Sequence, residues 1–413
     1  MPNATETSAV DAAQELKGKS LLLISSASPT KRAIFHRLKE LGVKLTLVST
    51  ETTWAARYAD AALTANTNDQ AEVLAKVEEY VKENKVDGAL TFWENAVPLC
   101  AALCEKFGWT GHPAQAALTA RNKLAMRKAL QTAKLGKYCP DFAEIKSLRD
   151  LDREIKRIGL PLVLKPAWGV KSQFVVRADT LDEARNAFNY IKSNMTAAFD
   201  PIYASGTQIM AEGYLDGAEV DVDLLVRGGE IKFHAFTDNM PTIEPFFVET
   251  GDAMPSRHED SDLDAVLTMA REVVAAIGLT NGALHLEAKI ESSGPKLIEL
   301  NARMGGDYLH DWIKAVWDVD MIEQAARIAA GLSCEPARLK QARLHLVGKY
   351  LIPPHSGVIS GLSAPQKDPA KIHDITLQKE PGDPVLVPPE GFETIGWVVG
   401  KGDTYSEAEE NLD

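Results

Sequence analysis

The sequence has few cysteines. Only Cys100, Cys104, Cys139 and Cys334 occur among its 413 residues, and none forms a CxxC motif or lies beside a histidine at zinc-finger spacing. This usage argues against a disulfide framework and predicts small buried side chains in a reducing cytoplasm. Cys100 and Cys104 are four residues apart on a predicted helix, so a metal-chelating pair stays open as the alternative.

Long apolar runs are also missing. No stretch is apolar over the length that a bilayer-spanning helix needs. The first residues, MPNATETSAVDAAQELK, have neither the basic nor the apolar region of a signal peptide, and we interpret residues 1–17 as a disordered tail. The sequence therefore predicts a cytoplasmic protein without a membrane partner.

Positive charge is in deficit. Acidic residues number 58 against 45 Lys and Arg, and the formal net charge is −13, whereas binding to nucleic acid needs a surplus of basic residues. We therefore expect no nucleic-acid partner, although a small anionic ligand in a local cationic pocket fits this charge. The turn after the first predicted strand lacks the glycine pattern of a dinucleotide site, which argues against an NAD or FAD enzyme.

The sequence does contain alternating strand and helix patterns, in a composition of 45% apolar and 25% charged residues that is typical of globular proteins. Within 20–110, continuous apolar runs separated by amphipathic stretches predict a parallel sheet flanked by helices. We place domain boundaries at 18–113 for an N-terminal α/β lobe, at 114–343 for a central region, and at 344–413 for a small β-rich subdomain. The chain stops inside a predicted helix over 406–413, so we expect the natural protein to be longer.

The most informative segment is GALHLEAKIESSGPKLIELNARMGGD, which begins at residue 282 and contains two predicted strands around a turn. With the hairpin centred on its second serine, Glu287 lies opposite Glu299, and His285 lies opposite Asn301. Opposed carboxylates are unfavourable in a sheet. Two carboxylates with an amide oxygen are, however, the hard ligands that Mg²⁺ prefers, and Mg²⁺ usually completes its shell with substrate phosphates. The alternative is a solvated amphipathic hairpin whose acids coincide by chance.

Three further segments carry groups that suit a nucleotide. Backbone N–H groups, a hydroxyl and lysine charges bind phosphate, and carboxylates bind amino and hydroxyl groups. For each segment alone, a solvated strand face or a structural lysine is the alternative. The groups are Glu212, Glu219, Asp221 and Asp223 on two neighbouring strands, Lys165, Gly169, Lys171 and Ser172 at a strand end and in the loop after it, and Lys123 near a helix start.

In order and spacing, these segments resemble the ATP-grasp superfamily, and within it the carboxylate–amine ligases, most of all the L-amino acid (dipeptide) ligases and carnosine-synthase-type enzymes. The shared pattern is a Lys, then Lys-Pro with a small-residue loop, then Glu-x(6)-Glu, then Glu-x(11)-Glu-x-Asn-x-Arg. The resemblance covers nearly the whole chain. It implies an α/β fold with α+β lobes: a parallel N-terminal lobe, a lid lobe at about 138–210, a nucleotide-binding core and a small C-terminal β region.

The resemblance also implies residue roles. ATP would be bound by Lys123, Lys165, Ser172, Glu212, Leu215 and Glu219. Two Mg²⁺ ions, with Mn²⁺ as a substitute, would be bound by Glu287, Glu299 and Asn301. The catalytic residues would be Arg303, Lys165 and His285, and Gly305 and Gly306 would lie beside the substrate. The lid loop departs from the family pattern Gly-x-Gly-Ser-x-Gly-Val, because Lys171 and Phe174 stand where small residues are common.

Three more residues are candidates for substrate binding. Asp307 suits a cationic amino group, with helix N-capping as the alternative. Glu94 follows Trp93 at a strand end and suits the acceptor pocket, with a surface acid as the alternative. Arg257 suits a substrate carboxylate, with a surface arginine as the alternative.

These features predict an ADP-forming ligase that activates an amino acid carboxylate as an acyl phosphate and joins it to the amine of a second amino acid or a similar amine. Two alternatives stay open: an ATP-grasp ligase with a non-peptide substrate, of the purine-biosynthetic or natural-product tailoring type, and a nucleotide-binding regulator without catalysis. The intact set of Glu287, Glu299, Asn301 and Arg303 argues against the regulator. Partners are expected to be small molecules, and a homodimer stays open because related ligases often dimerise.

Overall fold

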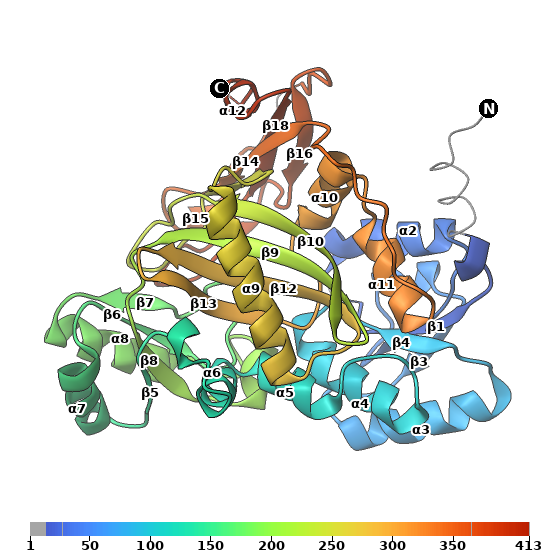
Figure 1. The fold of residues 1–413 in the computed structure, drawn as a ribbon, viewed down its shortest axis with the longest axis horizontal. Coiled ribbons are helices and arrows are strands. Elements are labelled where there is room, and N and C mark those ends of the chain that lie inside the picture. The colour runs from blue at the N-terminus through green and yellow to red at the C-terminus, as the bar shows by residue number, and fades with distance from the viewer. Residues whose placement is uncertain (1–13, 27, 365, 413) are drawn as a thin grey trace.

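The computed structural model describes residues 14–26, 28–364 and 366–412. Its chain forms an N-terminal lobe, a lid lobe and a core with one large sheet (Figure 1). The predicted tail lies mostly outside the described residues, but Leu16 is described and fully buried. Within the described ranges, no helix combines the length and the apolar character that crossing a bilayer requires.

The N-terminal lobe contains the predicted parallel sheet, in the order β3-β2-β1-β4. The chain runs outward from β1 to β2 and β3 and then returns to the other side of β1 as β4. The strand order therefore reverses between β1 and β4, and the loops after these two strands meet at the carboxyl edge of the sheet. The elements are β1 (Ser20–Ile24), η1 (Pro29–Lys31), α2 (Arg32–Glu40), β2 (Lys44–Ser49), η2 (Trp54–Tyr58), β3 (Ala61–Thr64), α3 (Gln70–Glu83), β4 (Gly88–Leu90), η3 (Glu94–Ala96) and α4 (Val97–Phe107).

The lid lobe is a four-stranded antiparallel sheet in the order β5-β8-β6-β7, with its own apolar core. The helix over 181–194 begins with a capping box, in which Thr180 and Glu183 each bond the other's backbone. Two helices lead from the N-terminal lobe into this lid. The elements are α5 (Ala114–Arg121), α6 (Lys123–Thr132), η4 (Gly136–Tyr138), β5 (Phe142–Ile145), α7 (Leu148–Ile158), β6 (Leu162–Pro166), β7 (Val176–Ala178), α8 (Leu181–Asn194), η5 (Pro201–Ser205) and β8 (Ile209–Gly213).

The core is an eight-stranded antiparallel sheet in the order β13-β12-β9-β10-β11-β14-β18-β16, with α9 lying across one face (Figure 1). Three C-terminal strands extend this sheet, so they are continuous with the strands that carry the predicted metal ligands. The predicted domain boundaries stay a prediction. The elements are β9 (Ala218–Arg227), β10 (Glu230–Asn239), β11 (Gly251–Met254), α9 (Asp260–Ile277), β12 (Gly282–Glu291), β13 (Gly294–Asn301), α10 (Leu309–Trp317), α11 (Met321–Ala329), β14 (His345–Leu351), β15 (Gly357–Val358), β16 (Ile372–Leu377), β17 (Pro384–Val385), β18 (Gly396–Gly402) and α12 (Tyr405–Glu410).

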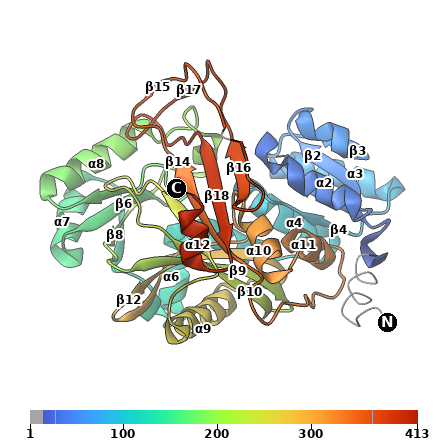
Figure 2. The same ribbon diagram turned by 90° about the horizontal axis from the view of Figure 1, so that it is seen from above.

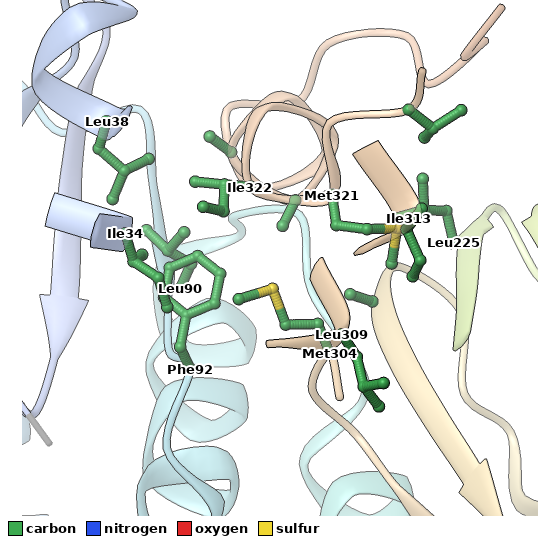
Figure 3. Packing of buried hydrophobic residues seen from close by; sticks show 14 of the residues in the cluster. Ile34, Leu38, Leu90, Phe92, Leu225, Met304, Leu309, Ile313, Met321 and Ile322 are labelled. Atoms are coloured by element: carbon green, nitrogen blue, oxygen red, sulfur yellow. The ribbon is translucent and has the colours of Figure 1, made fainter. Parts of the chain in front are cut away.

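Apolar packing fixes the N-terminal lobe against the core. Figure 3 shows side chains of α2 and of the strand region around β4 facing side chains of α10 and α11, with Met304 between the two groups. Burying one such side chain stabilises the fold by about 1.5–3 kcal/mol. Outside this cluster, Arg37 of α2 makes an ion pair with Asp320, with 2.6 Å between Nε and Oδ2. The carboxyl edge of the small sheet is therefore held beside the loop that follows β13.

His112 links the start of α5 to the start of β12. Its Nδ1 accepts hydrogen bonds from the backbone N–H groups of Thr280 and Asn281, at 3.1 and 3.3 Å. A ring nitrogen that accepts two hydrogen bonds must be unprotonated, so the imidazole is neutral here. Burial lowers the pKa of His112 to about 4.

We predict that His112 makes the fold less stable in acid. The pKa of His112 is about 4 in the folded chain and 6.5 in the unfolded chain. The stability that the neutral imidazole contributes is therefore fully present above pH 6.5 and is lost as the pH falls toward 4. The full loss from this residue is about 3 kcal/mol. Urea unfolding of the wild type and His112→Gln across this range measures it, and an equal pH dependence of the two proteins would contradict the assignment.

Candidate active site

A cavity of about 880 Å³ lies where the three lobes meet. Figure 2 shows the lid lobe and the N-terminal lobe on opposite sides of the core. The cavity wall includes the loops after β1 and β4, the lid loop after β6, strands β9 and β12, and the C-terminal segment around Pro388 and Phe392. Among the predicted site residues, the wall contains Lys123, Lys165, Ser172, Glu212, Leu215, Glu219, His285, Glu287, Glu299, Arg303, Gly306, Asp307 and Glu94.

The β12–β13 hairpin brings the predicted carboxylates together. Glu287 pairs with Glu299, and His285 pairs with Asn301, as the sequence predicted. The hairpin reaches this pairing in a different way from the one predicted. Its turn is Ser292-Ser293, and one extra residue of β13, Ile298, forms a bulge. This bulge shifts the register by one residue and so restores the predicted pairing, since a regular two-residue hairpin would place Ile298 opposite Glu287.

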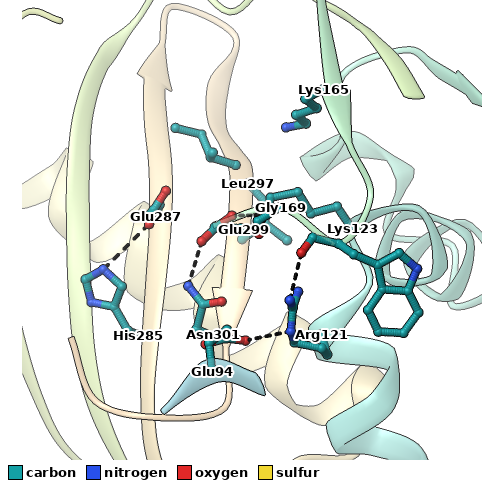
Figure 4. A network of polar contacts seen from close by, with 12 residues as sticks. Glu94, Arg121, Lys123, Lys165, Gly169, His285, Glu287, Leu297, Glu299 and Asn301 are labelled. Atoms are coloured by element: carbon teal, nitrogen blue, oxygen red, sulfur yellow. Dashed lines mark hydrogen bonds and ion pairs between the residues drawn. The ribbon is translucent and has the colours of Figure 1, made fainter. Parts of the chain in front are cut away.

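One of the two carboxylates is neutralised and the other is not. Lys123 Nζ lies 2.5 Å from Glu299 Oε2, and Asn301 Nδ2 donates to Glu299 Oε1 at 2.7 Å (Figure 4). Burial alone would raise the pKa of Glu299, but Lys123 and Asn301 outweigh it and hold that pKa below its usual value. Burial, reinforced by the negative charge of Glu299, raises the pKa of Glu287 well above its usual value. A divalent cation would supply the positive charge that Glu287 lacks, so the donor set fits Mg²⁺.

Among the described residues, no group of three or more His, Cys, Asp or Glu side chains is placed to hold a metal ion. The predicted Mg²⁺ ligands are two carboxylates and one amide. The alternative metal pair, Cys100 and Cys104, consists of free thiols that are both buried in α4 and its packing.

A second charged cluster joins the lid to the core. The Arg127 side chain is fully buried; its Nε donates to Glu212 Oε1 at 2.7 Å, and Lys165 Nζ lies 2.6 Å from Glu212 Oε2. The Arg127 guanidinium also donates to the carbonyl oxygens of Leu297 and Ile298, both at 2.8 Å. These two carbonyls belong to the β13 bulge. Arg127 therefore connects lid strand β8, helix α6 and the bulge that sets the position of Glu299.

Glu219 lies beside a lysine, and His285 lies between two carboxylates. Glu219 makes an ion pair with Lys289, at 3.3 Å. His285 Nε2 lies 3.5 Å from Asp221 Oδ2, and its Nδ1 lies 3.4 Å from Asp223 Oδ1. Burial, with the nearby charge of Glu287, raises the pKa of Asp221 well above its usual value.

Arg303 is positioned by an acid from the N-terminal lobe. Its Nε lies 2.7 Å from Glu94 Oε2. On the other side of this carboxylate, the Arg121 Nε lies 3.7 Å from Glu94 Oε1, as Figure 4 shows. Glu94 is only 4% exposed, so two guanidinium groups already compensate its charge. Glu94 lines the cavity while it pairs with both guanidinium groups, and its part in substrate binding stays a prediction.

The unusual lid loop is explained by packing. Phe174 is fully buried and contacts Tyr190, Phe199, Tyr203 and Phe392, so it anchors the loop in the lid core. Ser172 faces the cavity in a left-handed conformation, with φ of 52°. Lys171, with φ of 53°, lines the cavity beside it. Two cavity-facing residues are therefore held by one buried aromatic ring, which a small residue could not provide.

Two of the predicted substrate residues have different environments. Asp307 lines the cavity and accepts a hydrogen bond from Tyr350 Oη at 2.9 Å; the N-cap of α10 is Tyr308, so Asp307 does not cap that helix. The predicted role of Arg257 in substrate binding stays a prediction. Arg257 is absent from the cavity wall, because its guanidinium bonds Asp238 at 3.2 Å and stacks 3.8 Å from the ring centre of Tyr405.

Gly305 and Asn301 lie behind the wall. The Gly305 N–H donates to Asp223 Oδ1 at 2.8 Å, and a Cβ on Gly305 would lie 2.8 Å from that oxygen and 3.0 Å from His285 Nδ1. A Cβ on Gly306 would meet nothing within 4 Å. Close approach therefore requires glycine at 305 and not at 306.

Sequence reasoning missed Arg127. The signal was weak but present: Arg127 follows Lys123 by four residues on one helix, so both side chains lie on the same face. Nothing local indicates its partners, which come from positions 85 and 170 or more residues away.

Two protein-family models match the chain. One, described as the ATP-grasp domain, matches residues 158–311, and the other, described as the ATP-grasp N-terminal domain, matches residues 35–109. Together they cover more than half of the chain and both sides of the cavity. The predicted ATP-grasp resemblance is confirmed.

The chain is similar to curated ligases. Carnosine synthase 1 of Homo sapiens is 27% identical over 95% of this chain and 50% of that protein. Alanine–anticapsin ligase of Bacillus subtilis is 30% identical over 60% of this chain and 55% of that protein. The chain thus spans about half the length of these two relatives.

Solved structures share the fold. The L-amino acid ligase from Bacillus licheniformis superposes with a TM-score of 0.77 at 22% identity, over 95% of this chain and 96% of that one. Phosphoribosylglycinamide synthetase from Anaerococcus prevotii gives 0.72 at 20% identity, over 96% and 97%. The predicted fold, an α/β protein with α+β lobes and a parallel N-terminal lobe, is confirmed.

We predict that Arg127→Met strongly destabilises the protein. It leaves the buried Glu212 with one cation and removes the donors to two carbonyls, which costs about 3–5 kcal/mol. Arg185→Met is the matched control, because Arg185 makes a similar pair with Asp152 at the surface, where such pairs contribute about 0–1 kcal/mol. Denaturant unfolding compares them, and equal losses would refute the role of Arg127.

We also predict opposite responses at the two adjacent glycines. Gly305→Ala pushes a methyl group into Asp223 and His285 and should cost about 1–3 kcal/mol, whereas Gly306→Ala should change stability by less than about 1 kcal/mol. Thermal unfolding of both variants is the measurement. Equal stability of the two would show that the loop relaxes and that Gly305 is not needed for close approach.

Proposed function

The chain belongs to the ATP-grasp family, and we propose that it is an ATP-dependent, ADP-forming ligase that joins an amino acid carboxylate to the amine of a second amino acid or a similar amine. The observation that carries the proposal is the opposed pair Glu287 and Glu299, with Lys123 on one carboxylate and Arg303 near the same cavity. The similarity to carnosine synthase and to alanine–anticapsin ligase supports amide formation as the reaction class.

The nucleotide would lie between the lid and the core. Lys165, Glu212, Leu215 and Glu219 line the part of the cavity formed by β6, β8 and β9, which suits adenine and ribose. Lys123 and Lys165 offer their ammonium groups to phosphate, and Ser172 offers its hydroxyl and the N–H groups of its loop. Arg127 keeps Glu212 and Lys165 in place.

Bound Mg²⁺ would be held by Glu287, Glu299 and Asn301, and it would neutralise charge on the transferring phosphoryl group. Mn²⁺ fits the same oxygen ligands. The number of ions, which we propose to be two, depends on the oxygen atoms that the nucleotide adds.

Activation of the carboxylate solves a leaving-group problem. A carboxylate does not react with an amine at neutral pH, because the group to be expelled is oxide. In the first step a carboxylate oxygen of the donor attacks the γ-phosphorus and the bond to the β-phosphate oxygen breaks, which gives an acyl phosphate and ADP. Lys123, Lys165 and Arg303 supply fixed positive charge for this transfer.

Amide formation follows in the same cavity. The neutral amine attacks the acyl carbon, phosphate leaves with the bonding electrons, and the amine loses one proton to solvent or to a nearby base such as His285. Arg303, oriented by Glu94, faces the oxygen that becomes negative in the tetrahedral state. The lid loop and its buried Phe174 exclude water that would hydrolyse the intermediate.

A ligase with a non-peptide acceptor uses the same first step and stays the second candidate. A regulator without catalysis is less well supported, because it has no need of an oriented arginine beside the carboxylate pair. We propose a cytoplasmic location and leave homodimerisation as a prediction; both follow from the sequence.

A pairwise screen of the standard amino acids with ATP and Mg²⁺ separates these candidates. We expect phosphate release that requires both a donor and an acceptor, and a product whose mass is the sum of the two amino acids less water. Release that no amino acid pair stimulates would overturn the peptide-ligase proposal. Phosphate release with other amines would then favour the second candidate, and the absence of any turnover would favour the regulator.

We predict that Arg303→Ala abolishes amide formation while sparing ATP binding. Loss of one charge that stabilises the reacting oxygen should lower amine-dependent ADP release by about 10²–10³-fold. ATP affinity, measured by titration calorimetry, should change little, because Lys123 and Lys165 remain. Arg185→Ala is the control, since Arg185 pairs with Asp152 on the lid surface outside the cavity wall and its removal should leave turnover unchanged. Unchanged turnover in Arg303→Ala would refute this role.

A further inference from the structure

The N-terminal lobe places one lysine in the cavity that none of the motifs accounts for. Lys31 ends η1 in the loop after β1, and it lines the cavity together with Trp93 and Glu94 from the loop after β4. These are the two loops that flank the reversal of strand order between β1 and β4. In open parallel sheets, ligands bind in the crevice at this edge.

The Lys31 ammonium has no ion-pair partner among the described carboxylates, whereas three other cations of the same cavity do. Lys123 pairs with Glu299, Lys165 pairs with Glu212, and Arg303 pairs with Glu94. Burial lowers the pKa of Lys31 to about 8, against the attraction of Asp307 and with the repulsion of Arg303 and Lys171. A partly buried cation in this setting is stabilised by an anion that enters the cavity.

The chemistry of the proposed reaction indicates which anion this is. When two amino acids are joined, the donor keeps its ammonium group and the acceptor keeps its carboxylate. The donor carboxylate reacts, so it must lie beside Glu287, Glu299 and Arg303. Lys31, by contrast, comes from the N-terminal lobe, which also supplies Glu94 beside Arg303, and it makes no ion pair with Glu287 or Glu299. Asp307 supplies negative charge in the same cavity for the donor ammonium.

We propose that Lys31 binds the carboxylate of the amine substrate, so that the acceptor is an amino acid with a free carboxylate rather than a simple amine, amide or ester. This inference rests on the proposed function and deepens it. It makes Lys31 a specificity-determining residue, which selects the acceptor without touching the reacting atoms.

The experiment compares each acceptor with its primary amide. In the full-length wild type, the best acceptor found in the pairwise screen should have a KM on the order of tenfold lower than its amide, as expected for loss of a charge-assisted contact. Lys31→Met should raise the KM of the acid to that of the amide. It should leave the KM of the amide, the KM of ATP and kcat within about twofold.

Lys19→Met is the matched control. Lys19 precedes β1 at the opposite edge of the same sheet and pairs with Asp87 at 3.8 Å. The Lys19→Met variant loses an equal charge from the same lobe, and we expect it to keep the preference for the acid over the amide. A Lys31→Met protein that keeps the wild-type preference, or one that loses ATP affinity instead, would overturn the proposal.

A second measurement does not depend on turnover. Trinitrobenzenesulfonate modifies neutral amines, and peptide mass spectrometry follows its reaction at Lys31 in the wild type. N-acetylated amino acids, which have a carboxylate but no reactive amine, should protect Lys31 and their amides should not, and a non-hydrolysable ATP analogue alone should give no protection. Protection by carboxylates would support the site even if the screen found no ligase activity. Equal protection by amides, or protection by the nucleotide alone, would overturn it even in an active ligase.

Discussion

One buried guanidinium holds the candidate site together. Arg127 on α6 donates to Glu212 of lid strand β8 and to the two carbonyls at the β13 bulge. β13 is the edge strand of its sheet, and a buried backbone oxygen there without a donor is destabilising. By donating to the carbonyl oxygens of Leu297 and Ile298, Arg127 stabilises the bulge, and the bulge in turn places Glu299 opposite Glu287. The parts of the cavity proposed for the nucleotide and for the metal thus share one support.

Around this support, each lobe contributes a different kind of charge. The core supplies carboxylates on adjacent strands, where repulsion would separate them without a cation. The helix and lid supply lysines that neutralise only some of those acids. The N-terminal lobe supplies Glu94, which orients Arg303, and the cation Lys31. The apolar packing in Figure 3 fixes the N-terminal lobe against the core, so these charges meet at defined distances.

The sequence predicted what depends on local periodicity. Continuous apolar runs were enough for the parallel sheet. Alternation along two strands put Glu287 and Glu299 on facing strands, but their pairing depends on the Ile298 bulge, which alternation does not predict. The sequence could not predict contacts between distant segments. The partners of Arg127 lie on other elements far along the chain, and the Arg257 guanidinium bonds Asp238 and stacks on Tyr405. The sequence did not explain why Phe174 stands in a loop predicted to bind phosphate, because its packing partners, including Phe392, come from elsewhere in the chain.

The continuity of the large sheet has a consequence for dissecting the protein. Strands β14, β18 and β16 complete the sheet beyond β11, whose four residues are all buried. A chain cut before β14 would turn β11 into an open edge, with unpaired N–H and C=O groups along a strand that is otherwise buried. Such edges recruit other strands and lead to aggregation. The C-terminal strands therefore cover an edge of the sheet that carries the candidate site, and we expect their removal to expose that edge.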